Sequence, residues 1–238
     1  MQPPAIPADP TNTAAGLWPR AVAWLIDAML IGLPVCALMW LLGDGSGDAL
    51  ASQWHGLGTA MGDAMTAAAL RGDSPLTMLQ AWTSEEGPLR PAINDVVGGM
   101  YAAAWPAAAL FALLALLVWP LQDAGQYHAT FGKRMLGLQV ETAEGAQPGP
   151  ARVYRRHVAG SVSWLTLNIG HVMAVTAPRH QALHDRIART RVVWRPGVDR
   201  QVPMWGWLLL VIAFALPLLV AIKAAYTMNA AMQASLGL

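Results

Sequence analysis

Charged residues are scarce in this chain of 238 residues. Lys, Arg, Asp and Glu make up 12% of it, about half the share of an ordinary soluble domain, whereas hydrophobic residues make up 55%. The formal net charge of +1 gives no basic surplus that would attract a nucleic acid. The single cysteine, Cys36, excludes an internal disulfide, a cysteine-rich zinc site and a Cys-x-x-Cys redox pair.

The hydrophobic residues are concentrated in three long stretches. A bilayer core about 30 Å thick needs roughly 20 apolar residues in helical form. Ala21–Leu42 meets that length with one charged residue, Asp27, whereas Val96–Trp119 and Pro203–Ile222 contain none. We therefore predict an all-α membrane protein with three long transmembrane helices, the first beginning near Leu17, and with the lipid bilayer as its main partner.

The segments outside these stretches differ in composition. Residues 1–16 are rich in proline and are expected to form a disordered tail, with no cleavable signal because the apolar run after Arg20 is too long. Residues 43–95 form a long acidic connection, in which one or two short helices are expected. The C-terminal tail, residues 227–238, contains no charged side chain.

Two basic segments, 121–157 and 178–202, predict the topology. Basic loops lie on the cytoplasmic side of membranes, so the weakly apolar Val158–Ala177 between them should enter the membrane and return. We favour such a re-entrant hairpin, turning at Asn168–Gly170, over a fourth full span. The N-terminus is then cytoplasmic and the 43–95 loop external.

Two short segments on the cytoplasmic side have the composition of strands. Met135–Glu141 and Thr190–Trp194 are rich in residues that favour strands, and turn-forming residues follow both. We predict that they pair as a small two-stranded cytoplasmic sheet, which would bring Lys133 and Arg134 near Arg191.

Arg20 and Asp27 are the charged residues of the first helix. They are seven residues apart, so they share one face of that helix, and Asp27 lies about 10 Å further along it. An ionisable group within a membrane is costly and marks a candidate site. We expect Asp27 to face the protein interior, toward Arg20 and the 158–190 segment, with Asp185 bonded to an arginine or a backbone amide nearby. Arg20 could equally be an interfacial anchor, and Asp27 half of a structural ion pair.

Further polar side chains are secondary candidates for the same site. They are Asn168, His171, His184, Arg186, Lys133 and Arg134. His180 and His184 have a spacing that can bind metal, but the chain offers no further ligand set, and we expect no metal and no cofactor. No nucleophile motif, phosphate loop or pair of catalytic carboxylates is apparent, so an enzyme is not expected.

Three motifs in this order resemble the RDD family of bacterial membrane proteins. They are RAVAWLIDAMLI beginning at Arg20, FGKRMLGLQV beginning at Phe131 and QALHDRIARTRVV beginning at Gln181. The family is named for an arginine and two aspartates, which match Arg20, Asp27 and Asp185. The second motif is usually preceded by Thr-Pro, where this chain has Thr130-Phe131, and the third usually contains Ala-Gly-Thr, where it has Ala188-Arg189-Thr190.

The resemblance implies a membrane domain over residues 17–194, followed by an additional helix and short tail over 195–238. It also implies a role in transport of an ion, such as a monovalent cation, or of a small solute through the Arg/Asp cluster. Three spans are few for such a pathway, so a homo-oligomer is expected. The alternative is a non-catalytic assembly or accessory protein, whose charged cluster is structural and whose 43–95 loop docks a membrane-protein partner.

Overall fold

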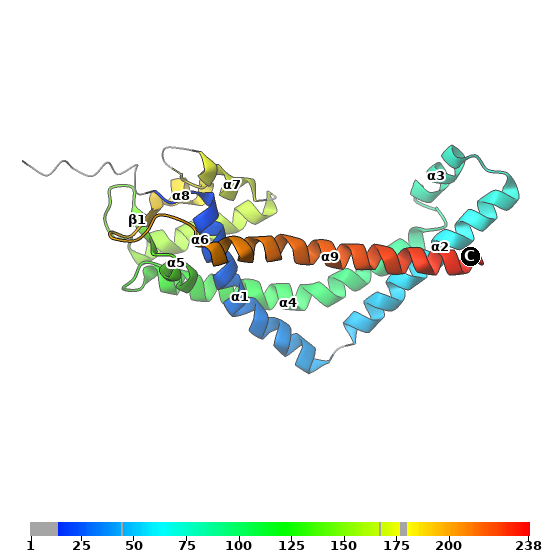
Figure 1. Cartoon of the computed structure of the whole chain (residues 1–238), viewed down its shortest axis with the longest axis horizontal. Helices are drawn as coiled ribbons and strands as arrows, with labels where there is room; N and C mark the ends of the chain where they lie inside the picture. The colour runs from blue at the N-terminus through cyan, green and yellow to red at the C-terminus, as the bar shows by residue number, and fades with distance from the viewer. Residues whose placement is uncertain (1–13, 44, 167, 177–179) are drawn as a thin grey trace, which may run out of the picture. The chain divides into compact units, whose positions relative to one another are not determined.

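The computed structural model describes residues 14–43, 45–166, 168–176 and 180–238 (Figure 1). Most of the expected disordered tail therefore lies outside the described residues. In chain order the helices and strands are α1 (Leu17–Leu42), α2 (Ser46–Arg71), α3 (Pro75–Thr83), α4 (Arg90–Ala124), α5 (Phe131–Met135), β1 (Leu138–Thr142), α6 (Pro150–Leu165), α7 (Ile169–Val172), η2 (Met173–Val175), α8 (Leu183–Ala188), β2 (Thr190–Trp194) and α9 (Met204–Ser235).

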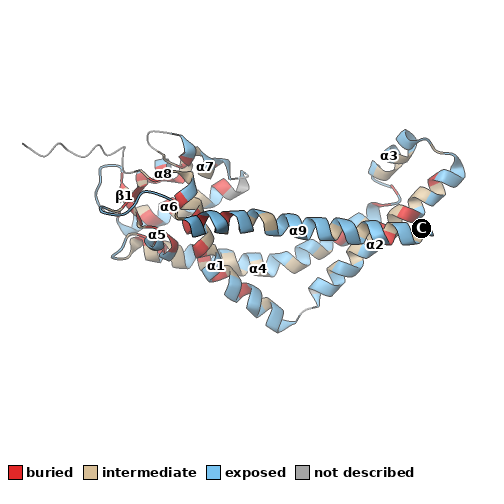
Figure 2. Ribbon diagram, in the orientation of Figure 1, coloured by how far each residue is buried: buried red, intermediate tan, exposed pale blue. Residues whose placement is uncertain are grey.

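Within the described part of the chain, three helices are long and apolar enough to cross a membrane: α1, α4 and α9. The prediction of three transmembrane helices is therefore confirmed. Most residues of α9 are exposed (Figure 2), as expected for a helix whose side chains contact lipid. The predicted ranges of the second and third of these helices were too short. Helix α4 starts before Val96 and continues through Pro120, and α9 extends past Ile222 because the following Ala- and Met-rich run favours helix.

The structure divides into two compact units. One contains residues 1–34 and 111–212, and the other contains residues 35–110 and 213–238. Helices α1, α4 and α9 each contribute to both. All the residues of the buried charged network described below belong to the first unit.

In the second unit, α2 is longer than the short helices expected in the 43–95 connection. Glycines normally disfavour a helix by about 1 kcal/mol each, but here they allow close packing. A Cβ added at Gly58 or Gly62 would overlap backbone atoms of α9, at Met228 and Met232 respectively. Trp54 also donates its indole N–H to the Ala224 carbonyl, at 2.6 Å. Tertiary packing against α9 thus offsets the low helix propensity of these glycines.

In the first unit, β1 and β2 form a two-stranded antiparallel sheet, which confirms the predicted pairing. Leu138 lies opposite Trp194, and Glu141 lies opposite Arg191. This register also corrects one expectation. Lys133 precedes the end of β1 that pairs with Trp194, whereas Arg191 lies toward the other end of the sheet and is paired with Glu141 at 2.6 Å.

The sheet packs against the beginning of α1. Val22, Ala23 and Ile26 of α1 are buried in one cluster with residues of both strands and with Leu210 of α9. The backbone N–H of Ala15 donates to Val192 of β2 at 2.9 Å, which attaches the chain before α1 to the sheet. One face of the first turns of α1 is therefore buried against protein, and this places Arg20 and Asp27 next to the segment that follows α4.

Asn168, at the position where the hairpin was expected to turn, has a left-handed conformation with φ of 64°. Helix α6 begins at Pro150, earlier than the expected Val158, and ends before this turn, so 158–177 is not one continuous spanning helix. Helix α6 is amphipathic. Its buried side includes Val153, Arg156 and Ser163 and packs toward α8, whereas Val158 and Val162 are exposed.

Candidate functional site

The carboxylate of Asp185 lies at the centre of a clamp in which two arginines bind opposite oxygens. Arg20 Nη1 donates to Oδ2 at 2.5 Å, and Arg156 Nε donates to Oδ1 at 2.8 Å. The backbone N–H of Ala182 also donates to Oδ2, at 3.2 Å. Asp185 is completely buried, and charge-assisted hydrogen bonds of this kind are roughly twice as strong as neutral ones. The clamp thus joins α1, α6 and α8.

Arg20 uses the rest of its guanidinium to hold the backbone. Its Nε donates to the Ala15 carbonyl at 2.9 Å, and its Nη2 donates to the His180 carbonyl at 2.6 Å. The planar fork of an arginine can make such bonds in several directions at once, which a lysine ammonium cannot do in the same geometry. Arg20 is therefore a structural centre of the site as well as the counter-ion of Asp185.

A second carboxylate, Asp123, lies near the end of α4 and is also completely buried. Lys133 Nζ donates to both of its oxygens, at 2.6 and 2.7 Å. Arg156 Nη1 donates to Oδ2 at 3.2 Å, and His157 Nε2 lies 2.9 Å from the same atom. Because Arg156 binds both Asp123 and Asp185, the two carboxylates belong to one continuous network.

The third carboxylate, Asp27, is held differently. It is 5% exposed and accepts hydrogen bonds from the Thr130 hydroxyl at 2.5 Å and from the Gly132 backbone N–H at 2.7 Å. It forms no ion pair with a Lys, Arg or His among the described residues. A Cβ added at Gly132 would overlap the backbone carbonyl of Ala23, so glycine is needed for α5 to approach α1 this closely.

The ionisable groups of the network outside the spanning helices have shifted pKa values. Burial would raise the pKa of Asp185, but the attraction of Arg20 and Arg156 outweighs burial and holds that pKa well below its usual range. Burial lowers the pKa of both His157 and His184, so the two imidazoles are neutral near pH 7. The network consequently contains ionised carboxylates paired mainly with permanent cations.

Comparison with known proteins identifies the family of the chain. The model of the RDD family matches residues 14–189, which is most of the chain. The chain belongs to the RDD family. It is also similar to the uncharacterized protein YxaI of Bacillus subtilis (strain 168), at 24% identity over 181 residues, covering 76% of this chain and 97% of that protein. No solved structure matches.

The structure brings together two of the three residues that match the RDD motif. Arg20 and Asp185 are in direct contact, as expected for Asp185. The prediction for Asp27 is half right. Asp27 does face the protein interior, but its partners come from Thr130 and Gly132 and not from Arg20 or the 158–190 segment. The expectation failed because Arg20 is already occupied by Asp185 and by backbone carbonyls.

The secondary candidates have separate environments. Lys133 belongs to the network, whereas Arg134 is exposed and lies 4.0 Å above the ring of Tyr127. His184 contacts the network through Arg156, at 3.3 Å, and its ring lies against that of His171. Asn168 and Arg186 are exposed. Arg179, in the basic segment 178–202, lies outside the described residues.

Sequence reasoning missed Asp123, Arg156, His157 and Thr130 as site residues. Asp123 was assigned to a loop because the second helix was ended at Trp119, before Pro120. A usable signal was nonetheless present. Asp123 lies at the start of the basic segment 121–157, directly after an apolar stretch, and a carboxylate beside several cations at a membrane boundary is a natural counter-ion.

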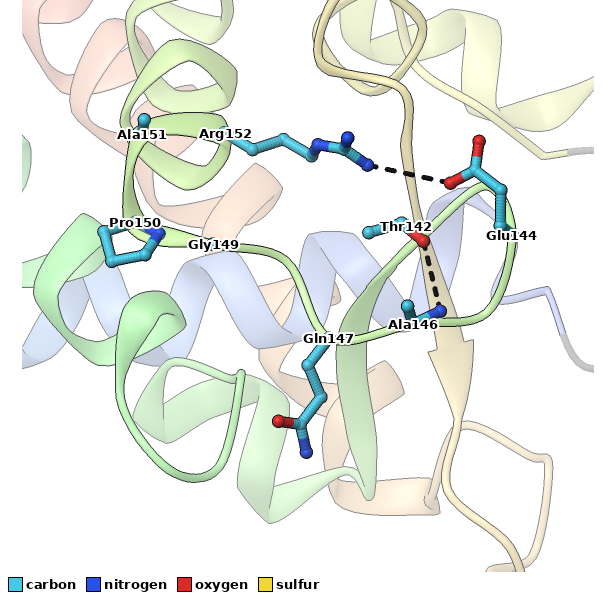
Figure 3. Close-up of a pocket in the computed structure, with 8 residues that line it drawn as sticks. All are labelled: Thr142, Glu144, Ala146, Gln147, Gly149, Pro150, Ala151 and Arg152. Carbon is cyan, nitrogen blue, oxygen red and sulfur yellow. Dashed lines mark hydrogen bonds and ion pairs between the residues drawn. The ribbon is translucent and has the colours of Figure 1, made fainter.

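The surface also has an open pocket, between the turn after β1 and the start of α6 (Figure 3). Its polar contacts are an ion pair between Arg152 and Glu144, at 3.7 Å, and a hydrogen bond from the Ala146 N–H to the Thr142 hydroxyl, at 3.1 Å. The hydrogen bond stabilises the turn and the ion pair joins the turn to α6, so we assign the candidate site to the buried network and not to this pocket.

Proposed function

We propose that this RDD family protein takes part in membrane transport of a monovalent cation or small solute, and that Asp27 is the group that exchanges the ion. The observation that carries the proposal is the contrast among three buried carboxylates. Asp123 and Asp185 each bind at least two cationic side chains, whereas Asp27 is held by a hydroxyl and a backbone N–H. A carboxylate without a fixed counter-ion can bind a mobile one.

The geometry supports Asp27 as the exchanging group for a second reason. Displacing a cation from Asp123 or Asp185 would leave a buried arginine or lysine uncompensated, which costs several kcal/mol. Neutralising Asp27 with a proton or a metal cation breaks only two hydrogen bonds from neutral donors. The network formed by Arg20, Asp123, Arg156 and Asp185 then acts as the rigid support of the site. We further propose that the protein is not an enzyme and acts as a homo-oligomer, because three spans are few for a pathway.

The test is the substitution Asp27→Asn in protein reconstituted into liposomes. Asparagine keeps an oxygen that can accept from Gly132 and an amide that can donate to the Thr130 hydroxyl, so the fold should be retained. We expect cation-dependent or proton-coupled flux to be lost, with Na⁺, K⁺ and Li⁺ each tested against a pH-sensitive dye. The matched control is Asp95→Asn, since Asp95 is exposed near the start of α4 and forms no part of the network.

A second function is favoured by a different observation. The charges of Asp123, Asp185 and Arg156 are all paired with one another or with neighbouring side chains, as expected of a structural ion-pair network that holds α4, α6 and α8 together. The protein would then be an assembly or accessory protein whose 43–95 segment docks a membrane-protein partner. In that case Asp27→Asn would lose folding or assembly, or would leave flux unchanged, and either result contradicts the transport proposal.

The proposed topology rests on charge distribution and on the exposed surface of the hairpin. Val158, Val162 and Val172 are each more than half exposed, which supports entry of the α6–α7 hairpin into the bilayer as a re-entrant element. The N-terminus would be cytoplasmic and residues 43–95 external, in a bacterial inner membrane. Cysteine labelling after replacement of Cys36 tests this. Labelling of position 152 from outside, or failure of external reagent to reach position 73, would refute it.

A further inference from the structure

Two arginines share the ring of one tyrosine in the segment that follows α4. The guanidinium carbon of Arg134 lies 4.0 Å from the ring centroid of Tyr127, and that of Arg195 lies 5.9 Å from the same centroid. Both distances fall within the roughly 6 Å over which an aromatic ring attracts a cation. Because both are measured to one point, together they limit the separation of the two guanidinium carbons to at most 9.9 Å.

Backbone hydrogen bonds hold the two arginines at the same end of the sheet. The N–H of Gly137 donates to the Arg134 carbonyl at 3.1 Å, and the Gly137 carbonyl accepts from the Arg195 N–H at 2.8 Å. Arg195 Nη2 also donates to the Tyr127 carbonyl, at 2.9 Å, which fixes the loop that carries the ring. The arrangement is therefore built by the chain before any ligand binds.

The charges of these two arginines are not compensated by protein. Neither forms an ion pair with an Asp or Glu in the part of the chain that the structure describes. The exposed side chain of Arg134 contacts the ring and donates no hydrogen bond to any described residue. By contrast, the adjacent Lys133 is paired with Asp123 at 2.6 Å. Two like charges held near one ring without a carboxylate favour an anion from outside the chain.

The surroundings of the two arginines indicate where that anion comes from. Leu121, Tyr127, Phe131 and Met135 are all exposed, and they follow a helix that is long and apolar enough to cross a membrane. Exposed aromatic and apolar side chains beside arginines are typical of the boundary between lipid and water. The anionic group met at that boundary is the phosphate of a phospholipid headgroup.

We propose that Arg134 and Arg195 bind the phosphate of an anionic phospholipid, and that the ring of Tyr127 holds the two guanidiniums in place. An arginine presents its N–H groups in a planar fork that matches phosphate oxygens, and stacking on a ring leaves the edge of that fork free. A phosphate between two guanidiniums that each donate at about 2.8 Å spans roughly 10 Å between their carbons. The site is separate from Asp27 and does not depend on a transport function.

The first test measures lipid binding to the full-length protein in detergent by native mass spectrometry. Phosphatidylglycerol should bind, whereas phosphatidylcholine, whose headgroup has no net charge, should bind at least about tenfold more weakly. Inorganic phosphate at millimolar concentration should displace phosphatidylglycerol poorly, because it lacks the acyl chains that contact the apolar side chains. Equal binding of the two lipids, or full displacement by inorganic phosphate, would overturn the assignment to an anionic lipid.

Substitution of the arginines tests the site itself. A hydrogen bond to a charged group contributes about 1.5–3 kcal/mol, so the double variant Arg134→Gln, Arg195→Gln should bind phosphatidylglycerol about 100-fold more weakly. The matched control is Arg186→Gln, since Arg186 is exposed on α8 and has no aromatic ring contact. It should weaken binding by at most about fivefold, the effect of one cation near an anionic surface. Equal losses in the two variants would show general attraction and refute a defined site.

Substitution of the ring separates its holding role from that of charge. Tyr127→Phe keeps the ring and should bind phosphatidylglycerol like the unmodified protein, whereas Tyr127→Leu should bind about twofold to fivefold more weakly. Melting temperatures without lipid show whether each variant folds. If the double variant does not fold, Arg134→Gln alone serves, because that side chain makes no hydrogen bond within the described residues, and a tenfold loss is expected. Unchanged binding in both Arg134→Gln and Tyr127→Leu would overturn the proposal.

Discussion

Asp123 offers the sharpest test of the buried network, through the substitution Asp123→Asn. The side chain keeps its size, so the change removes charge without creating a cavity. Asp123 is completely buried and accepts from Lys133, Arg156 and His157. Without it, the ammonium of Lys133 has no carboxylate within ion-pair distance among the described residues, and Arg156 keeps only one carboxylate partner, Asp185.

The expected cost follows from the burial of these cations. Removing one partner of a buried ion pair typically destabilises a protein by about 3–5 kcal/mol, because the other charge stays buried without compensation. At roughly 2–4 °C per kcal/mol for a protein of this size, the melting temperature should fall by about 10 °C. The assay is thermal unfolding in detergent, followed by the fluorescence of the tryptophans.

Two further variants give this experiment its control and its mechanism. Asp73→Asn breaks an ion pair between Arg71 and Asp73 on the surface, at 2.8 Å, and should change the melting temperature little. The double variant Asp123→Asn with Lys133→Met removes the unpaired ammonium and should recover part of the loss. If Asp123→Asn melts within about 2 °C of the unmodified protein, water reaches these cations and the reasoning is wrong.

Two other predictions concern local packing. Gly132→Ala should destabilise the protein by about 1–3 kcal/mol and weaken the hydrogen bond to Asp27, because its Cβ would overlap a backbone carbonyl of α1. Gly149→Ala, in open space, should be tolerated. Equal melting temperatures of the two variants would argue against the close approach of Gly132 to α1. The register of the sheet predicts that cysteines replacing Glu141 and Arg191 form a disulfide under mild oxidation once Cys36 is removed, detected by a mobility shift after cleavage between them. Cross-linking of positions 141 and 193 instead would show a shifted register.

The fold was largely predictable from local patterns. Bilayer thickness sets the minimum length of an apolar helix, so α1, α4 and α9 could be found by composition alone. The pairing of β1 with β2 was predictable because both are short and rich in strand-forming residues, and because the charge distribution predicted both on the same side of the membrane. The length of α2 could not be inferred, since its glycines disfavour helix until the packing against α9 is known.

The candidate site was less predictable because its contacts join residues distant in sequence. Spacing along one helix suggested that Arg20 and Asp27 act together, but each has a different partner more than 100 residues away. The choice between these partners depends on how the segment after α4 folds back onto α1. It also depends on Gly132, whose backbone N–H is a donor that no pattern of side chains can reveal.

That backbone donor links two carboxylates on different spanning helices. Gly132 binds Asp27 of α1, and the next residue, Lys133, binds Asp123 of α4. Consecutive residues of the short helix α5 therefore hold both helices, and α5 cannot move away from Asp27 without pulling on the ion pair at Asp123. A cation that displaces Gly132 from Asp27 would thus act on the rigid network through a single peptide unit. If Asp27 exchanges a cation as proposed, the FGKR segment would couple that exchange to the fixed ion pairs of Asp123.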